Sequence, residues 1–343
     1  MATERMTAAA LEDLVTRALV ASRTSEANAR SVARALVAAE IDGQGGHGLS
    51  RVQSYAAQSR SGKVDGFATP LLTRTRSGSA MVDVAGGFAY PAFDLAIEAL
   101  PVMVHEAGIA AAGFVRSHHF GVVGRHVERL AEQGLVALAF GNTPGAMAAA
   151  GGRRPVFGTN PIAIAAPQQE GAPLVVDLAL SEVARGRIMA AAQRGEAIPE
   201  GWAFDAEGRP TTDAKAALAG SLNPSGGTKG AALALMVEVL AVALTGANPS
   251  HAASSFFDGD GPPPGVGQLL VAIDPDAFGA RVTFLERLSS ITGAMLADPG
   301  VRLPGMRRLE RRAAHAAAGT VGVEVKMLEA LKSLASADRH ASR

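Results

Sequence analysis

The chain has 343 residues, of which 48% are apolar, and its 32 lysines and arginines balance 32 aspartates and glutamates. This size allows two domains, or one domain with a large insertion, around a sizeable core. A formal net charge of zero gives no electrostatic basis for binding nucleic acid or an anionic membrane. Because the chain has no cysteine, disulfides, thiolate metal sites and cysteine nucleophiles are excluded. We expect a cytoplasmic protein that binds a small soluble molecule and no metal.

The N-terminal region predicts two helices. Thr7 can cap the first, and Ser25 can cap the second, in which apolar residues recur at helical spacing from 29 to 37. Residues 1–11 contain acidic side chains and lack an apolar segment with a cleavage site, so we expect no signal peptide.

The second helix leads into the glycine-rich segment 42–51, which places His47 four residues before Arg51. An arginine can grip a carboxylate through two charge-assisted hydrogen bonds, while an imidazole beside it exchanges a proton near neutral pH. This pair suits a small 2-oxo or 2-hydroxy acid. A histidine that caps the end of the helix and a surface arginine would give the same local pattern.

Strands and helices alternate after this segment, which predicts an α/β fold. The expected strands are 80–84, 109–115, 135–140, 161–166, 174–178 and 268–273, and the expected helices are 91–107, 125–133, 182–193, 278–296 and 306–317. The apolar run 230–244 is too short to span a bilayer and predicts a buried helix. No GxGxxG, Walker, HExxH or GxSxG motif occurs at a fitting place, which makes an ordinary Rossmann domain, phosphoryl transfer, a zinc protease and an α/β-hydrolase poor interpretations.

Polar clusters follow several predicted strands, where open α/β sheets bind their ligands. His118 and His119 follow one strand, and adjacent side chains there point to opposite sides, so a buried and an exposed histidine without function is the alternative. Thr159 lies in a Gly-Thr-Asn-Pro sequence that is also compatible with a plain turn. Asp177 ends another strand and could simply cap the following helix.

Two further segments could bind anions. The glycine-rich approach 223–230 carries Lys229 at the start of the apolar helix, which fits an anion site or a flexible connection. Arginines at 302, 307, 308, 311 and 312 surround Pro304-Gly305 and fit a phosphate site or a solvated basic helix face.

In combination, these clusters resemble the type-2 malate/L-lactate dehydrogenase family, which includes sulfolactate, ureidoglycolate, diketogulonate and piperideine/pyrroline-2-carboxylate enzymes. The similarity extends from the second helix to Arg312. The matching motifs, in chain order, are Asp42-Gly43 with His47-Gly48 and Arg51, His119-Phe120-Gly121, Gly158-Thr159-Asn160-Pro161, Asp177-Leu178-Ala179 with Ser181, Gly201-Trp202-Ala203 with Asp205 and Pro210-Thr211, Gly226-Gly227 with Lys229-Gly230, and Leu303-Pro304-Gly305.

The resemblance implies a homodimeric oxidoreductase with a non-Rossmann NAD(P)-binding fold, a mixed sheet with flanking helices. It implies an NAD(P)-binding part at 116–284 and a helical part for substrate and dimerisation at 1–115 with 285–343. Carried over, His47 is the proton donor, Arg51 the carboxylate clamp, and His119 and Thr159 further substrate contacts. The implied cofactor surroundings are His119, Phe120, Gly121, Asp177, Leu178, Ala179, Ser181, Thr228, Lys229, Pro304, Gly305, Met306, Arg307 and Arg308.

One position departs from the family pattern: Gly46 stands where serine usually precedes the histidine. The segments Arg153-Arg154-Pro155 and Pro304-Gly305-Met306-Arg307-Arg308 resemble those of the sulfolactate dehydrogenase and cyclic imine reductase branches more than those of the malate enzymes. We therefore expect hydride transfer between a nicotinamide cofactor, with NADP preferred over NAD, and a 2-oxo or 2-hydroxy acid. The alternatives are NADPH-dependent reduction of a cyclic ketimine and a catalytically silent, metabolite-binding dimer.

Overall fold

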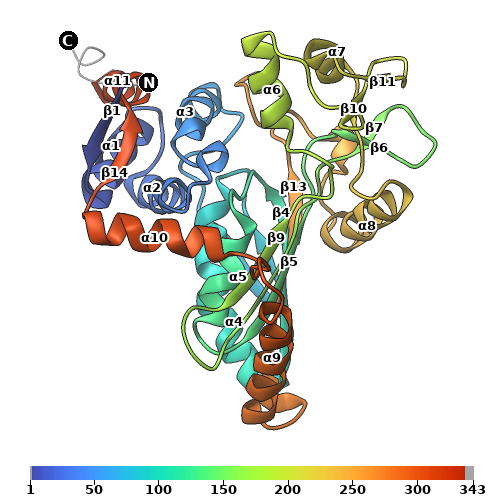
Figure 1. Cartoon of the computed structure of the whole chain (residues 1–343). Helices are drawn as coiled ribbons and strands as arrows, with labels where there is room; N and C mark the ends of the chain where they lie inside the picture. Colours follow the sequence, from blue (N-terminus) through green and yellow to red (C-terminus); the bar gives the residue numbers. More distant parts are fainter. Residues whose placement is uncertain (1, 337–343) are drawn as a thin grey trace.

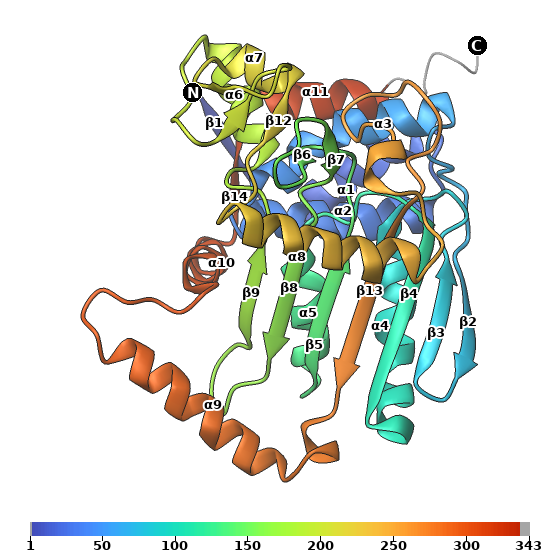
Figure 2. The same cartoon turned by 90° about the vertical axis from the view of Figure 1, so that its right-hand side faces the viewer.

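A computed structural model of the chain describes residues 2–336 (Figures 1 and 2). The predicted N-terminal caps are confirmed: the Thr7 hydroxyl accepts from the Ala10 N–H at the start of α1 (Ala8–Val20), and the Ser25 hydroxyl from the Asn28 N–H at the start of α2 (Glu26–Ile41). These helices pack with α3 (Val52–Ser61), α11 (Val325–Ser336) and a two-stranded sheet of β1 (Thr3–Met6) and β14 (Val321–Glu324) around one apolar core. Both ends of the described chain therefore build the same helical layer.

A seven-stranded sheet forms the centre of the molecule, with the order β2-β3-β4-β13-β5-β8-β9. All neighbours are antiparallel except β3 and β4. Its strands are β2 (Leu71–Arg76), β3 (Ser79–Asp83), β4 (Ile109–Ser117), β5 (Val136–Gly141), β8 (Ile162–Ala166), β9 (Leu174–Leu178) and β13 (Val266–Ile273). The mixed sheet with flanking helices confirms the predicted fold class.

Two helices cover one face of this sheet (Figure 2). Helix α4 (Ala89–Ala107) and helix α5 (Val123–Ala131) pack on alanines of alternate strand positions, among them Ala112, Ala139 and Ala163. Small residues on this face allow close approach of the helices. The arrangement brings the start of α5 beside the end of β9.

A smaller five-stranded sheet, of order β11-β10-β12-β6-β7, lies beyond the ends of the central strands. It comprises β6 (Met147–Ala148), β7 (Pro155–Phe157), β10 (Ala203–Phe204), β11 (Pro210–Thr211) and β12 (Ser221–Leu222) and packs with α6 (Arg185–Arg194) and α7 (Ala214–Ala219). Helix α8 (Thr228–Glu238) continues into a π-helical turn at Val239–Ala243. The last two long helices before α11 are α9 (Arg281–Leu296) and α10 (Met306–Ala318).

The prediction of a buried helix at 230–244 is wrong for one of its faces. Ala234 and Val237 are fully buried, but Leu235, Met236 and Leu244 are each more than half exposed. A uniformly apolar sequence carries no helical periodicity, so it does not tell which face meets the sheet. The other predicted helices and strands lie within a few residues of their expected bounds.

The predicted boundary between two parts at residue 115 stays a prediction. The central sheet takes β2, β3 and most of β4 from before this residue and its other strands from after it. No helix among residues 2–336 is long and apolar enough to cross a membrane.

Candidate active site

The segment after α2 is held in a compact turn by its own backbone and by Glu40. Gly48 packs so closely on Glu40 that a Cβ would lie 2.3 Å from the carboxylate, and the carboxylate accepts from the Leu49 N–H at 3.1 Å. The Arg51 Nε donates to the Gly46 carbonyl at 2.7 Å, and the Ser50 hydroxyl donates to the Gly45 carbonyl at 2.6 Å. The glycines therefore let two short 3-10 turns present His47 and Arg51 together.

His47 stacks on His119, which follows the end of β4. Their ring centroids are 5.2 Å apart and the rings are inclined by 16°. The Nδ1 of His119 is 2.5 Å from the Tyr55 hydroxyl, which lies 3.0 Å from the Tyr90 hydroxyl. Because Tyr55 holds Nδ1, His119 keeps Nε2 for a ligand.

His118 and His119 are both buried. The alternative of one buried and one exposed histidine without function therefore does not hold. Their rings do reach different partners: the His118 Nε2 lies 2.6 Å from the Gln58 side-chain oxygen. The Phe256 ring contacts both imidazoles, at centroid distances of 5.3 and 5.2 Å. A loop far along the chain thus closes over the strand end.

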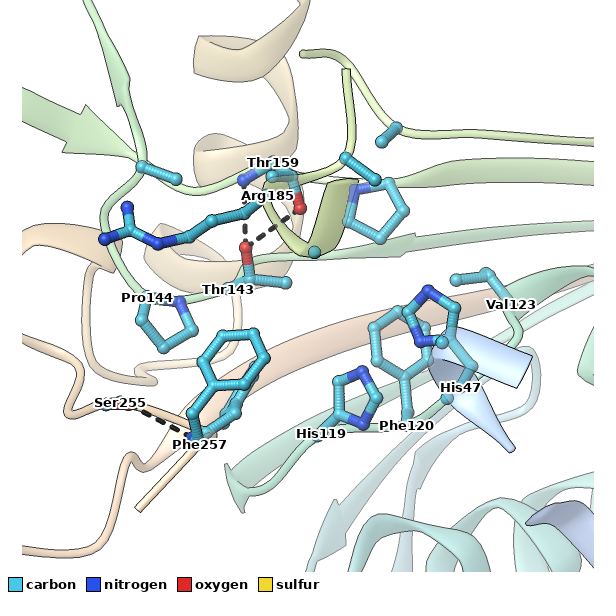
Figure 3. Close-up of a pocket in the computed structure, with 18 of the residues that line it drawn as sticks. His47, His119, Phe120, Val123, Thr143, Pro144, Thr159, Arg185, Ser255 and Phe257 are labelled. Atoms are coloured by element: carbon cyan, nitrogen blue, oxygen red, sulfur yellow. Dashed lines mark hydrogen bonds between the residues drawn. The ribbon is translucent and has the colours of Figure 1, made fainter. Parts of the chain in front are cut away.

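A cavity of about 760 Å³ opens beside the stacked rings of His47 and His119 (Figure 3). Such a volume suits a bound small molecule. Thr143 and Thr159 line it together, and the Thr159 N–H donates to the Thr143 hydroxyl at 2.9 Å. Arg51 also lines it, with its guanidinium carbon 4.6 Å from the centroid of the Phe257 ring. The cavity therefore combines arginines, histidines, hydroxyls and aromatic walls.

Burial keeps His47 and His119 neutral. Burial, reinforced by the positive charge of Arg51, lowers the pKa of His47 to about 4, and the same causes hold the pKa of His119 well below its usual value. Burial raises the pKa of Tyr55 to about 12, so its hydroxyl stays protonated. A substrate carboxylate beside Arg51 would offset its charge and make His47 easier to protonate.

A second hollow of about 480 Å³ shares Gln44, Val122 and Asp177 with the cavity. It is also lined by the segment that follows α9, with the exposed arginines Arg302 and Arg307. The Asp177 carboxylate accepts from the Gly124 N–H at 2.7 Å. The sequence suggested that Asp177 could cap the helix after it, but it bonds the first turn of α5, which comes earlier in the chain.

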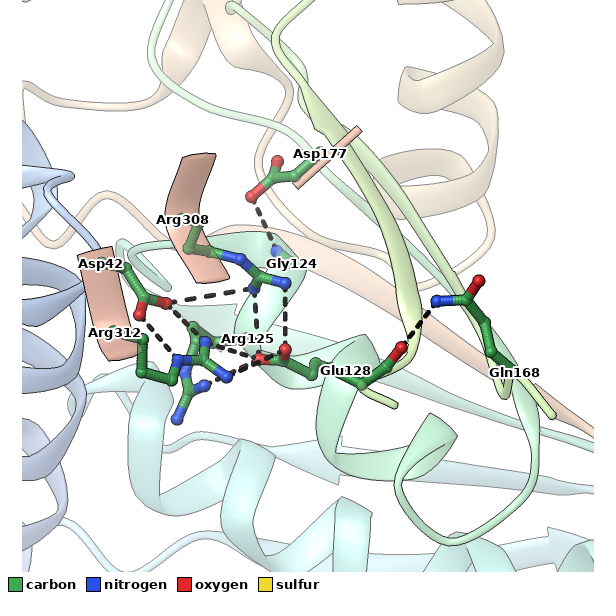
Figure 4. Close-up of polar contacts among 9 residues, drawn as sticks. Asp42, Gly124, Arg125, Glu128, Gln168, Asp177, Arg308 and Arg312 are labelled. Carbon is green, nitrogen blue, oxygen red and sulfur yellow. Dashed lines mark hydrogen bonds and ion pairs between the residues drawn. The ribbon is translucent and has the colours of Figure 1, made fainter. Parts of the chain in front are cut away.

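Asp42 and Arg308, which line this hollow, belong to a cluster of charges around the buried Glu128 (Figure 4). The Glu128 carboxylate, 1% exposed, accepts from Arg308 at 2.9 Å, from Arg312 at 3.1 Å and from Arg125 at 2.7 Å. Arg312 also bonds Asp42 at 2.8 Å. Burial alone would raise the pKa of Glu128, but these arginines hold it below its usual value. The cluster ties α5 and α10 to the residue that begins the His47 segment.

The structure brings most of the proposed site residues together. The cavity is lined by His47, Arg51, His119, Phe120, Gly121, Thr159, Asp177, Leu178 and Ala179, and the second hollow by Pro304, Gly305, Met306, Arg307 and Arg308. Ser181, Thr228 and Lys229 line neither space: the Ser181 hydroxyl bonds the Val183 carbonyl, and the other two are exposed at the start of α8. The roles of all these residues remain predictions.

Sequence reasoning missed several side chains of the cavity, among them Thr143, Arg185 and Phe257. Thr143 follows β5 directly, so its place at a strand end was a usable signal. Phe257 comes from a loop whose position depends on the whole fold, and no local pattern marks it.

Comparisons with known proteins agree with this geometry. Residues 6–332 match the family model described as malate/L-lactate dehydrogenase. The chain belongs to the malate/L-lactate dehydrogenase family. It is 51% identical over 298 residues to a (2R)-3-sulfolactate dehydrogenase (NADP(+)) of Chromohalobacter salexigens, covering 87% of this chain and 88% of that protein.

Other relatives are named as imine reductases. The chain is 44% identical over 316 residues to a Delta(1)-pyrroline-2-carboxylate/Delta(1)-piperideine-2-carboxylate reductase of Pseudomonas putida, covering 90% of this chain and 91% of the relative. The crystal structure of a delta1-piperideine-2-carboxylate reductase from Pseudomonas syringae superposes with a TM-score of 0.91 at 38% identity, over 97% of this chain and all of that one. The predicted family, its fold and the oxidoreductase class are thus confirmed.

Proposed function

We propose that this chain transfers a hydride between NADP(H) and a small 2-oxo or 2-hydroxy acid, of the kind named for its sulfolactate dehydrogenase relative. The observation that carries this proposal is the pairing of His47 with Arg51 at one cavity, where the imidazole is stacked on His119. An arginine without a carboxylate partner fits a substrate acid, and an adjacent imidazole fits its carbonyl or hydroxyl oxygen.

The space fits a dinucleotide cofactor. The main cavity and the second hollow adjoin at Gln44, Val122 and Asp177, so an elongated molecule can extend from the histidines toward Arg302 and Arg307. The bound nicotinamide supplies or accepts the hydride. The cofactor is NADP(H), and the two exposed arginines suit its additional phosphate, whereas Arg308 is already paired with Glu128.

The residues of this chain would act on the substrate as follows. Arg51 holds the carboxylate and so fixes the carbonyl carbon in the cavity. As the hydride is transferred, charge develops on the carbonyl oxygen, and the protonated form of His47, which the substrate carboxylate favours, donates its proton there. In the opposite direction neutral His47 accepts the proton of the hydroxyl. His119, with Nδ1 held by Tyr55, keeps the His47 ring stacked in place.

Reduction of a cyclic ketimine is the second candidate, and the relatives of that name favour it. An imine nitrogen that is already protonated needs less help from an acid. The Nδ1 of His47 is buried without a hydrogen-bond partner among the described residues, and Gly46 offers no hydroxyl to orient it. An imine substrate would tolerate such an imidazole better than a 2-oxo acid would.

A panel assay separates these candidates. Purified protein is mixed with NADPH or NADH and with 3-sulfopyruvate, oxaloacetate, pyruvate or Δ1-piperideine-2-carboxylate, and the nicotinamide absorbance is followed. We expect turnover of at least one 2-oxo acid, with NADPH used better than NADH. Turnover of the imine alone would favour the second candidate. Cofactor binding without turnover of any member would favour a silent, metabolite-binding dimer.

We also propose a cytoplasmic homodimer. Only Thr292 is buried among the sixteen residues of α9, while Val282 and Ile291 are each 60% exposed. A single helix with so little packing has no source of stability, so a partner surface is needed. Helix α8 crosses only the upper ends of the central strands in Figure 2, and below it Ile164 of β8 is an exposed apolar side chain. Ile291→Asp should shift the mass measured by sedimentation from dimer to monomer, and an unchanged mass would refute this interface.

A further inference from the structure

The cavity contains a second arginine, Arg185, which lies at the start of α6. Its Nη2 donates to the Leu218 carbonyl at 3.0 Å. No carboxylate among residues 2–336 forms an ion pair with it, in contrast to Arg308 and Arg312, which are paired with Glu128. A guanidinium has five N–H donors, so Arg185 keeps donors for a ligand.

More positive than negative side chains line the cavity. Arg51 and Arg185 line it, and Asp177 is the single acidic residue among positions 2–336 that does. The Asp177 carboxylate is engaged by the Gly124 N–H, next to Val123. Partly buried cations are costly unless a ligand or partner neutralises them. A cavity with two uncompensated guanidinium groups fits an anion with two charges.

Arg185 lies on the side of the cavity that faces away from the second hollow. Figure 3 shows Arg185 near Thr143 and Pro144, with His47 and Val123 at the other side. Arg51 contacts Phe257, which lies on the Arg185 side in the same view. The hollow proposed for the cofactor phosphates adjoins the cavity at Val122 and Asp177, next to Val123. Arg185 and the Phe257 ring that Arg51 contacts therefore lie on the side of the cavity away from the hollow proposed for the cofactor phosphates.

We propose that Arg185 binds a second anionic group of the substrate, so that the enzyme selects short 2-oxo and 2-hydroxy acids that carry a sulfonate or carboxylate at C3. This inference rests on the proposed function and adds its substrate class. Arg51 holds the carboxylate next to the reacting carbon, and Arg185 holds the distal anion. The hydroxyls of Thr143 and Thr159, 3.3 Å apart, line the space and can donate to the same anion.

Kinetics of Arg185→Gln test this selection. We expect kcat/KM for 3-sulfopyruvate and oxaloacetate to fall about 10- to 100-fold, the loss that a charge-assisted hydrogen bond to a ligand typically causes, with pyruvate changed less than threefold. Arg185→Lys should restore part of the loss for the doubly charged acids. Arg194→Gln is the matched control, because Arg194 lies at the other end of α6 in an exposed pair with Glu196 and should leave every ratio unchanged.

Binding measurements separate this inference from the proposed function. By calorimetry with unreactive acids, Arg185→Gln should weaken 3-sulfopropionate about tenfold or more and leave propionate unchanged. This result would stand even if the enzyme reduced no 2-oxo acid, an outcome that would refute the proposed function alone. Equal losses for singly and doubly charged acids, or a weaker Kd for NADPH with substrate selectivity intact, would overturn the role of Arg185.

Discussion

Replacing Glu128 with glutamine should destabilise the fold strongly, because this carboxylate neutralises a buried group of arginines. Glu128 is 1% exposed and bonds Arg308, Arg312 and Arg125, while Arg308 is itself 9% exposed. Removing one member of a buried ion pair costs about 3–5 kcal/mol, because the remaining charge keeps its desolvation cost. Each kcal/mol shifts the Tm of a domain of 150–250 residues by about 2–4 °C, so we expect a fall of about 5–15 °C in this larger chain.

Thermal unfolding followed by circular dichroism measures this shift, with Glu26→Gln as the control. Glu26 forms an exposed i, i+4 pair with Arg30, which should contribute less than about 1 kcal/mol. Since the arginines hold the pKa of Glu128 below its usual value, its stabilisation is complete above that usual value and is lost as the pH falls through the lowered one. The difference between the two proteins should thus be constant from pH 6 to 8 and shrink in acid. A Tm within about 2 °C of the unaltered protein at pH 7 would refute the reasoning.

Three further outcomes follow from the site. Arg51→Lys should raise the KM for 2-oxo acids and leave the Kd of NADPH unchanged, because a point charge does not replace a bidentate fork; a shift in cofactor Kd alone would contradict this. Gly46→Ser should fold normally, because a Cβ at this position meets nothing within 4 Å. If the new hydroxyl reaches His47, kcat for 2-oxo acids should rise. An unchanged kcat would mean that the hydroxyl does not orient the imidazole ring. Because burial lowers the pKa of His47 to about 4, kcat/KM for hydroxy acid oxidation should show no loss from its protonation between about pH 5.5 and 8, and a break near 6.5 would contradict the burial argument.

The sequence predicted the parts of the fold that have local signals. Thr7 and Ser25 mark helix starts through side-chain hydrogen bonds within a few residues, and period-two or continuous apolar runs mark β4, β5, β9 and β13. The strand β14 and its partner β1 are more than 300 residues apart, and neither forms without the other. Such pairings depend on the whole fold and leave no local pattern.

The site residues also differ in whether a local sequence signal marks them. His47 and Arg51 lie four residues apart, so one short segment predicts their combination. Arg308 shows the limit: its sequence context fits both a phosphate site and a solvated helix face, but the folded chain buries it against Glu128, 180 residues away. Arg185 was missed because no local pattern shows that it lines the cavity without an ion-pair partner in the described part of the chain.

The central claim is that His47 exchanges the proton with a 2-oxo acid held by Arg51. Its most direct test is the kcat of His47→Gln for NADPH-dependent reduction of the best 2-oxo acid substrate, compared with the unaltered enzyme at saturating cofactor. A general acid contributes about 10²- to 10⁴-fold, so we expect a fall of that size while the Kd of NADPH stays unchanged. A kcat within about threefold of the unaltered enzyme would contradict the account and remove His47 from the chemistry.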